Sequence, residues 1–216
     1  GERGSERRDS RCAAIVPGAT ILLSVLALLW LDGHAPERTA RRAVEKAEAV
    51  SLMQRAMANI KAEKARLGIR IDSQSDVHRT GMIGERFNDL TTTIGSLPSK
   101  RTSTNPAFAA AVVDMLARAG VRHGDTVAVC FSASFPALNI AVLSAVRALG
   151  LRPLIISSVG ASMYGANQAE MTWLDMESVL EREGVLPYRS IAASLGGISD
   201  THGGLDGTGL DTGIAA

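Results

Sequence analysis

Aromatic residues and net charge are both scarce in this sequence of 216 residues. Aromatic side chains make up 4% of the chain, which leaves few rings on which the bases of a single-stranded nucleic acid stack. The 23 basic residues are balanced by 22 acidic ones, whereas a nucleic-acid-binding domain usually carries a basic excess on one face. The composition therefore predicts no nucleic acid among the partners.

Cysteine is almost absent, since Cys12 and Cys130 are the only two. Cys12 adjoins an apolar segment and Cys130 ends a predicted buried strand, so we expect two unpaired, small apolar side chains and no disulfide. The short Cys–Cys or Cys–His spacing of a structural zinc site does not occur. We expect neither a metal nor a cofactor.

Three glycine-based motifs are missing as well. The phosphate-binding loop GxxxxGK[ST] and the dinucleotide fingerprint GxGxxG do not occur. The nucleophile elbow GxSxG needs glycine on both sides of its serine, but Ser134 lies between Ser132 and Pro136. These absences argue against a P-loop nucleotidase, a dinucleotide enzyme and an α/β-hydrolase.

The first feature that is present is an uncharged segment at residues 12–31. A helix needs about 20 apolar residues to cross a bilayer core, and this segment has that length. Arginines are frequent before it, whereas Asp32 follows it directly, and positive charge stays on the cytoplasmic side of a membrane. We therefore expect a single-pass anchor in the cell membrane, with residues 1–11 as a basic cytoplasmic tail and the main domain outside the cytoplasm. A cleaved signal peptide is the alternative.

Residues 36–67 predict one long helix, because strong helix formers dominate, apolar residues recur at three- and four-residue spacing, and Gly68 ends the pattern. We expect this helix to be a stalk. Residues 68–104 are polar and irregular, with one short helical piece near residues 85–90. They are expected to form a linker, a surface loop, or a segment that closes over a site.

Residues 105–204 predict an α/β domain. Apolar strands at 123–131, 152–159 and 189–197 alternate with helices at 106–120, 136–150 and 171–184. Asn105 is a plausible N-cap, and a glycine ends each helix. Such alternation is typical of a parallel sheet with helices on its faces, here a Rossmann-like, three-layer arrangement. Residues 205–216 form a Gly-rich tail.

Three loops, at residues 131–136, 157–168 and 194–204, follow the three strands and are rich in Ser and Gly. Ligands of open parallel sheets bind beyond the carboxyl ends of the strands, so we expect these loops to form one site. The candidate ligand-binding residues are Ser132, Ser134, Asn139, Ser158, Ser162 and Asn167.

Ser132 and Ser134 lie just before Pro136, the expected first residue of a helix. Unpaired backbone N–H groups and the helix dipole at such a position favour a carboxylate or a phosphate. In the simpler interpretation, Ser134 only caps the helix.

Four further residues can carry chemistry. Asp200 and His202 share one Gly-rich loop, where they form ordinary loop polarity, pair for acid–base work or bind a metal. Asp175 and Glu177 begin the last helix, where they complement its dipole or act as a base or metal ligand. The candidate catalytic residues are Ser134, Asp200 and His202.

The runs AVCFSASFPALNIAVLSA, SSVGASMYGANQAEMTWLDME and AASLGGISDTHGG resemble the poly-gamma-glutamate system protein family, as does the segment Ile83–Ala110. These are bacterial membrane-anchored proteins encoded beside the enzymes that make and export poly-gamma-glutamate, a capsule polymer. The resemblance implies an accessory role in that pathway, with the synthesis and export proteins as partners and poly-gamma-glutamate or glutamate as ligand. Family members have glycine where Ala133 stands and continue beyond the third strand, which implies a shortened, incomplete domain here.

Three functions therefore stay open. The chain is an anchored accessory factor that binds glutamyl carboxylates, or a hydrolase or transferase that acts on poly-gamma-glutamate through Ser134 or the Asp200–His202 pair. In the third interpretation it is a structural partner whose anchor and stalk assemble a membrane complex.

Overall fold

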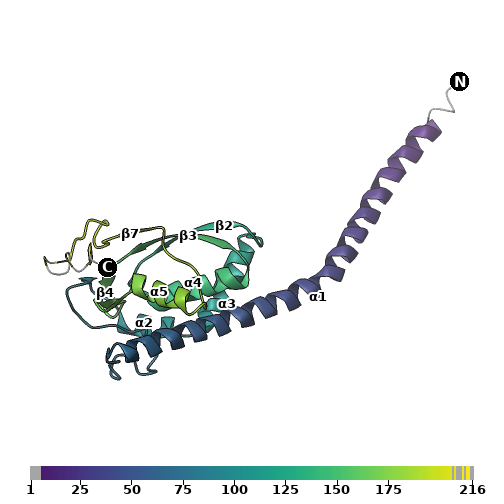
Figure 1. Ribbon diagram of the computed structural model, residues 1–216. Coiled ribbons are helices and arrows are strands. Elements are labelled where there is room, and N and C mark those ends of the chain that lie inside the picture. The colour runs from purple at the N-terminus through teal and green to yellow at the C-terminus, as the bar shows by residue number, and fades with distance from the viewer. Residues whose placement is uncertain (1–5, 206, 208–210, 212, 215–216) are drawn as a thin grey trace. The chain divides into compact units, whose positions relative to one another are not determined.

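The computed structural model describes the backbone of residues 6–205, 207, 211 and 213–214, and the side chains of residues 23–26 and, within the same set, from residue 39 on. The chain divides into two compact units, residues 1–43 and 44–216. Helix α1 (Glu6–Arg66) forms the described part of the first unit and continues into the second (Figure 1).

Helix α1 runs without interruption through residues 32–35, which separate the predicted anchor from the predicted stalk helix. A proline inside a helix removes one backbone hydrogen bond and often bends the helix without ending it, so Pro36 does not stop α1. The helix ends, as predicted, just before Gly68, whose φ is +74°. Among the residues with described side chains, no helix has the length and apolar character that a bilayer span requires. The predicted anchor at residues 12–31 falls mostly on side chains outside the described set.

A parallel sheet of order β2-β3-β7 organises the second unit. Helix α4 connects β2 to β3, helix α5 lies between β3 and β7, and helix α3 precedes β2. The predicted α/β fold with a parallel sheet and flanking helices is thus confirmed, with these bounds: α3 (Ala107–Arg118), β2 (Thr126–Phe131), α4 (Pro136–Ala148), β3 (Arg152–Ser158), α5 (Trp173–Arg182) and β7 (Ala192–Ser194).

The described helices of this unit cover one face of the sheet (Figure 1). The strand order runs in one direction, and right-handed crossovers then place α4 and α5 on the same face. Ile155 points to the helices and is 1% exposed, whereas its neighbours Leu154 and Ile156 are 49% and 47% exposed. The three-layer arrangement therefore does not occur in the part of the chain that the structure describes. Cys130, predicted to be buried, is exposed on the open face beside its register partner Ile156.

The hydrophobic core lies between the sheet and the helices. Helix α1 contributes Met53, Met57 and Ile60 of the predicted apolar stripe, together with Leu52. The predicted stripe also began at Val44, which is 66% exposed, so that end of the prediction is wrong. The Trp173 ring of α5 meets the Phe131 ring edge-on, with ring centroids 5.6 Å apart. Each fully buried large apolar side chain stabilises the fold by about 1.5–3 kcal/mol, so this layer fixes the strand ends that carry the loops.

Residues 68–104 pack against the domain. Strand β1 (Thr91–Thr93) pairs in parallel with β4 (Ala161–Ser162), and helix α2 (Leu97–Ser103) contacts α4. The predicted helical piece at residues 85–90 is wrong, because Asn88 Oδ1 accepts a hydrogen bond from Leu90 N and so favours a turn. Strands β5 (Asn167–Gln168) and β6 (Met171–Thr172) form an antiparallel pair just before α5.

The predicted helix ends are largely confirmed. Positive φ values at Gly120, Gly150 and Gly184 follow α3, α4 and α5. Asn105 Oδ1 accepts a hydrogen bond from Ala107 N at 3.0 Å, although Pro106 occupies the N-cap position of α3. Thr172 and Asp175 form a reciprocal capping box, so Asp175 serves the start of α5, as its simpler interpretation held.

Candidate functional site

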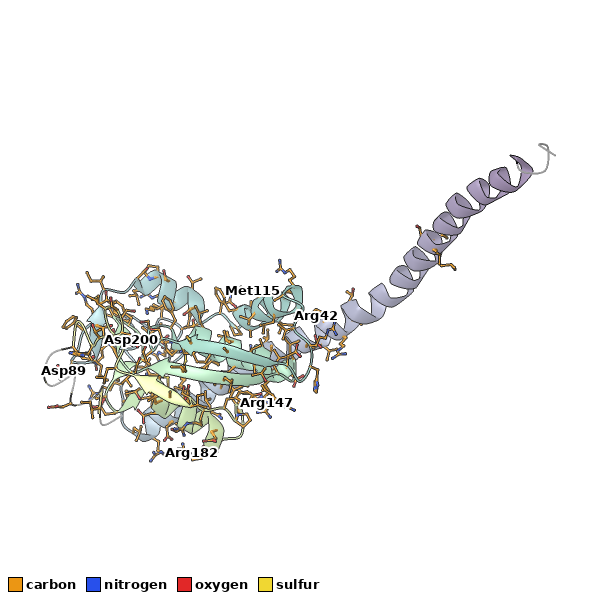
Figure 2. All side chains as sticks on the ribbon, turned by 90° about the horizontal axis from the view of Figure 1, so that it is seen from above. Arg42, Asp89, Met115, Arg147, Arg182 and Asp200 are labelled. Atoms are coloured by element: carbon orange, nitrogen blue, oxygen red, sulfur yellow. The ribbon has the colours of Figure 1, made fainter. Side chains whose placement is uncertain are left out.

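The three predicted loops meet in one cavity of about 380 Å³ at the carboxyl ends of the strands. Figure 2 shows Asp200, from the third loop, at this end of the second unit. Residues of every loop line the cavity, and strand β1 adds a further wall: Thr92, Thr93, Ser132, Ser134, Ser158, Gly160, Gly196, Gly197, Ile198 and Asp200. The three loops therefore lie together, as predicted, and ligand binding between them stays a prediction.

Ser132 and Ser134 form a hydroxyl pair in the wall of the cavity. Ser132 Oγ donates to Ser134 Oγ at 2.9 Å, and Ser134 Oγ also accepts from Ser162 N at 3.0 Å. Helix α4 begins at Pro136, as predicted, but no side chain caps it. Ser134 is therefore not the helix cap; its hydroxyl instead joins the first loop to the second.

Lys100, on helix α2, lies directly behind this pair. It is 2% exposed, and its Nζ donates to Ser162 Oγ at 2.7 Å and to the carbonyl oxygen of Ser134. The ammonium group also lies 3.8 Å from the centroid of the Phe135 ring, a cation–π contact. Burial lowers the pKa of Lys100 from 10.5 to about 8.

Close backbone contacts hold the loops together. A Cβ atom at Gly165 would lie 2.9 Å from both the Ala133 carbonyl oxygen and Ser134 Cα, so only glycine allows the second loop to pass this close to the first. Ala166 N donates to the same Ala133 oxygen at 2.8 Å. The wall that carries Ser134 is thus fixed from two directions.

Asn139 and Asn167, both predicted to bind ligand, brace the loops instead of lining the cavity. Asn139 Nδ2 donates to the Ser132 carbonyl oxygen at 3.0 Å. Asn167 is fully buried, and its amide group bonds Glu85 N, the Glu85 carbonyl oxygen and Thr91 Oγ1. Of the other predicted residues, Ser158 lines the cavity, whereas Ser162 lies behind it against Lys100.

The predicted Asp200–His202 pair is not formed as a hydrogen bond among the contacts that the structure describes. Asp200 Oδ1 accepts instead from Ser194 Oγ at 2.6 Å, and Asp200 lines the cavity whereas His202 does not. Both residues lie in the left-handed region of backbone conformation, with φ values of 60° for Asp200 and 53° for His202. Within the described residues no cluster of three or more His, Cys, Asp or Glu side chains could hold a metal.

Glu177 is buried in a polar network on the helix side of the sheet. Its Oε2 accepts from Ser190 N at 2.8 Å, and its Oε1 accepts from Ser190 Oγ and Ser157 Oγ. Trp173 Nε1 donates to Ser157 Oγ at 3.1 Å. The network connects α5 to β3 and to the approach to β7, so Glu177 positions the third loop and does not line the cavity.

The geometry favours binding over nucleophilic catalysis. A serine nucleophile needs a base at its hydroxyl and access to the substrate. Ser162 has its hydroxyl against Lys100 but is 5% exposed, whereas Ser134 lines the cavity but meets Lys100 through its backbone carbonyl. Neither serine combines both requirements.

Three residues at the cavity were not predicted from the sequence. Thr92 and Thr93 reach the cavity through the pairing of β1 with β4, and Lys100 reaches Ser134 across 34 positions of the chain. The one signal for them in the sequence is the polar, irregular character of residues 68–104, which includes a segment closing over a site among its interpretations. Comparison with family models, curated proteins and solved structures finds no match to this chain.

Proposed function

We propose that the cavity binds a carboxylate, and that the chain is a membrane-anchored accessory protein of poly-gamma-glutamate synthesis or export. The pathway rests on the resemblance of the three loop sequences to that family. In this proposal residues 12–31 insert in the cell membrane, and the α/β domain faces the extracytoplasmic side, where it meets the polymer and the export proteins.

The observation that carries carboxylate binding is the position of Lys100. Its ammonium group is buried against two neutral oxygens and an aromatic ring. Burial of a charge is costly unless an opposite charge compensates it. A carboxylate in the cavity would accept a hydrogen bond from the Ser134 hydroxyl, whose oxygen already accepts from Ser132 Oγ and Ser162 N. It would then lie close to the ammonium group that bonds the Ser134 carbonyl oxygen, and the positive end of the α4 dipole would add to the attraction.

Titration of the full chain in detergent micelles with short γ-glutamyl oligomers tests the proposal by calorimetry. We expect saturable binding that Ser134→Ala weakens by about 10-fold, since the variant loses a hydrogen bond to a charged group. Ser178→Ala is the matched control, because that hydroxyl bonds only the Leu174 carbonyl within its own helix. Absence of saturable binding, or equal loss in both variants, would refute carboxylate binding at this cavity.

A further inference from the structure

The cavity has two kinds of wall. The loop at 131–136 contributes Ser132 and Ser134 to the lining, and strand β1 contributes Thr92 and Thr93, all four with hydroxyl side chains. The third loop contributes Asp200, the one acidic residue among the described residues that line the cavity. A hydroxyl group donates to an anion, whereas an ionised carboxylate only accepts, so the two sides suit opposite charges.

Asp200 is held in place for such a role. Its Oδ1 accepts from Ser194 Oγ at 2.6 Å, at the end of β7, and its backbone N donates to the Gly197 carbonyl oxygen at 3.1 Å. An ionised carboxylate has about four acceptor positions, so the bond from Ser194 leaves capacity for a ligand. A ligand with negative charge alone would be repelled by this side chain, since like charges within a small site raise each other's energy.

We infer that the cavity is specific for a ligand that carries a carboxylate and an ammonium group together, namely an α-amino acid or the amino-terminal residue of a peptide chain. The carboxylate lies on the side of Ser132 and Ser134, backed by Lys100, and the ammonium group bonds Asp200. This inference rests on the proposed carboxylate site and adds a recognition element to it. A cavity of about 380 Å³ is within the range of about 300–1,000 Å³ that small-molecule sites span.

For a polymer, this arrangement selects one position on the chain. Free α-carboxylates repeat along poly-gamma-glutamate, because its amide bonds use the γ-carboxyl groups, whereas a free amino group occurs only at its amino-terminal residue. A site that needs both groups therefore binds the chain end and leaves the interior unbound. Asp200 is in this view a binding residue that determines specificity.

A calorimetric comparison of L-glutamate with glutarate tests the inference on the full chain in detergent micelles. Glutarate is glutamate without the amino group, so it keeps both carboxylates and adds no bulk. We expect glutamate to bind about 10-fold more tightly, the usual contribution of a charge-assisted hydrogen bond. Asp200→Asn should weaken glutamate binding to the level of glutarate and leave glutarate unweakened, while Asp89→Asn, at an exposed carboxylate that does not line the cavity, should preserve the difference.

The outcomes separate the two proposals. If glutamate and glutarate bind the wild-type protein equally, and Ser134→Ala weakens both, the carboxylate site stands and the inference of an ammonium site is overturned. If neither ligand binds, carboxylate binding fails and the inference fails with it. If Asp200→Asn and Asp89→Asn behave alike, Asp200 is not the ammonium partner and the inference is overturned.

Discussion

Lys64 and Lys100 are two buried lysines in the same domain, and their surroundings differ. Each is 2% exposed, and burial lowers the pKa of each from 10.5 to about 8. Lys64 Nζ donates to Gln168 Oε1 at 2.7 Å, and the charges of Asp76 and Glu85 offset part of the burial effect. Lys100 contacts a hydroxyl, a carbonyl and a ring, and burial is the cause of its shift.

The difference is what the proposed role of Lys100 rests on. The chain itself supplies negative charge near Lys64, so that lysine connects α1 to β5 and needs nothing further. Lys100 has comparable burial without such compensation, and it lies behind the hydroxyl pair of a cavity. A bound carboxylate would complete the environment of Lys100 and leave that of Lys64 unchanged.

The largest effect on stability is expected from Asn167→Ala, because the Asn167 side chain connects the segment near Lys64 to the segment beside the cavity. Asn167 bonds Glu85, near Lys64, and Thr91, at the start of β1 beside the cavity. Each buried polar group left without a partner costs about 1–3 kcal/mol, so the free energy of unfolding should fall by about 3 kcal/mol or more in urea denaturation. Ser158→Ala, which removes one bond of 3.4 Å, is the control and should change it by less than about 0.5 kcal/mol. Equal urea midpoints for the two variants would contradict the bracing role of Asn167.

The second prediction compares the effects of Lys100 and Lys64 on the affinity for glutamate. Lys100→Met removes the positive charge behind the cavity but keeps an unbranched side chain, and should weaken glutamate binding by about 10-fold. Lys64→Met removes an equally buried charge from the other region and should leave the affinity unchanged. Calorimetry on both variants measures this, and a similar loss in both would show that the two lysines do not differ in function.

The cavity loops were predictable because their signals are local. A Ser/Gly-rich turn after each apolar strand identifies Ser132, Ser134, Ser158 and Asp200, since parallel strands end at one edge of a sheet. The ends of α1, α3, α4 and α5 were predictable for the same reason, because a glycine in the left-handed region follows each of these helices.

Lys100 and Asn167 were not predictable, because their roles depend on contacts between distant segments. Lys100 meets Ser162 across 62 positions, and Asn167 meets Glu85 across 82. A polar residue in a loop looks like a ligand contact until its partners are known, and a lysine in a polar segment looks exposed. The open face of the sheet was not predictable for a similar reason. The order of the strands decides on which face the crossover helices lie, and that order depends on pairing between distant segments.

The third prediction concerns the pH dependence of glutamate binding. A bound carboxylate favours the charged form of Lys100, so binding should be accompanied by proton uptake near pH 8. Affinity should therefore be constant below about pH 8 and fall as the pH rises through that value. In Lys100→Met the fall should disappear, whereas in Lys64→Met it should remain. A fall of the same size in both variants would assign the titration to another group.

The last prediction concerns the pH dependence of stability. Because both lysines bind a proton less tightly in the folded state, the unfolded chain carries more protons between pH 8 and pH 10.5, and stability should rise over that interval. Either Lys→Met variant should reduce the rise in stability, which urea denaturation at several pH values measures.

Saturating glutamate distinguishes the two lysines, because a bound carboxylate should raise the pKa of Lys100 toward its ordinary value. The rise that is left in Lys64→Met should diminish with glutamate, and the rise that is left in Lys100→Met should not, since Lys64 does not line the cavity. If glutamate affects both variants equally, the ligand acts on the whole fold and Lys100 is not its counter-charge.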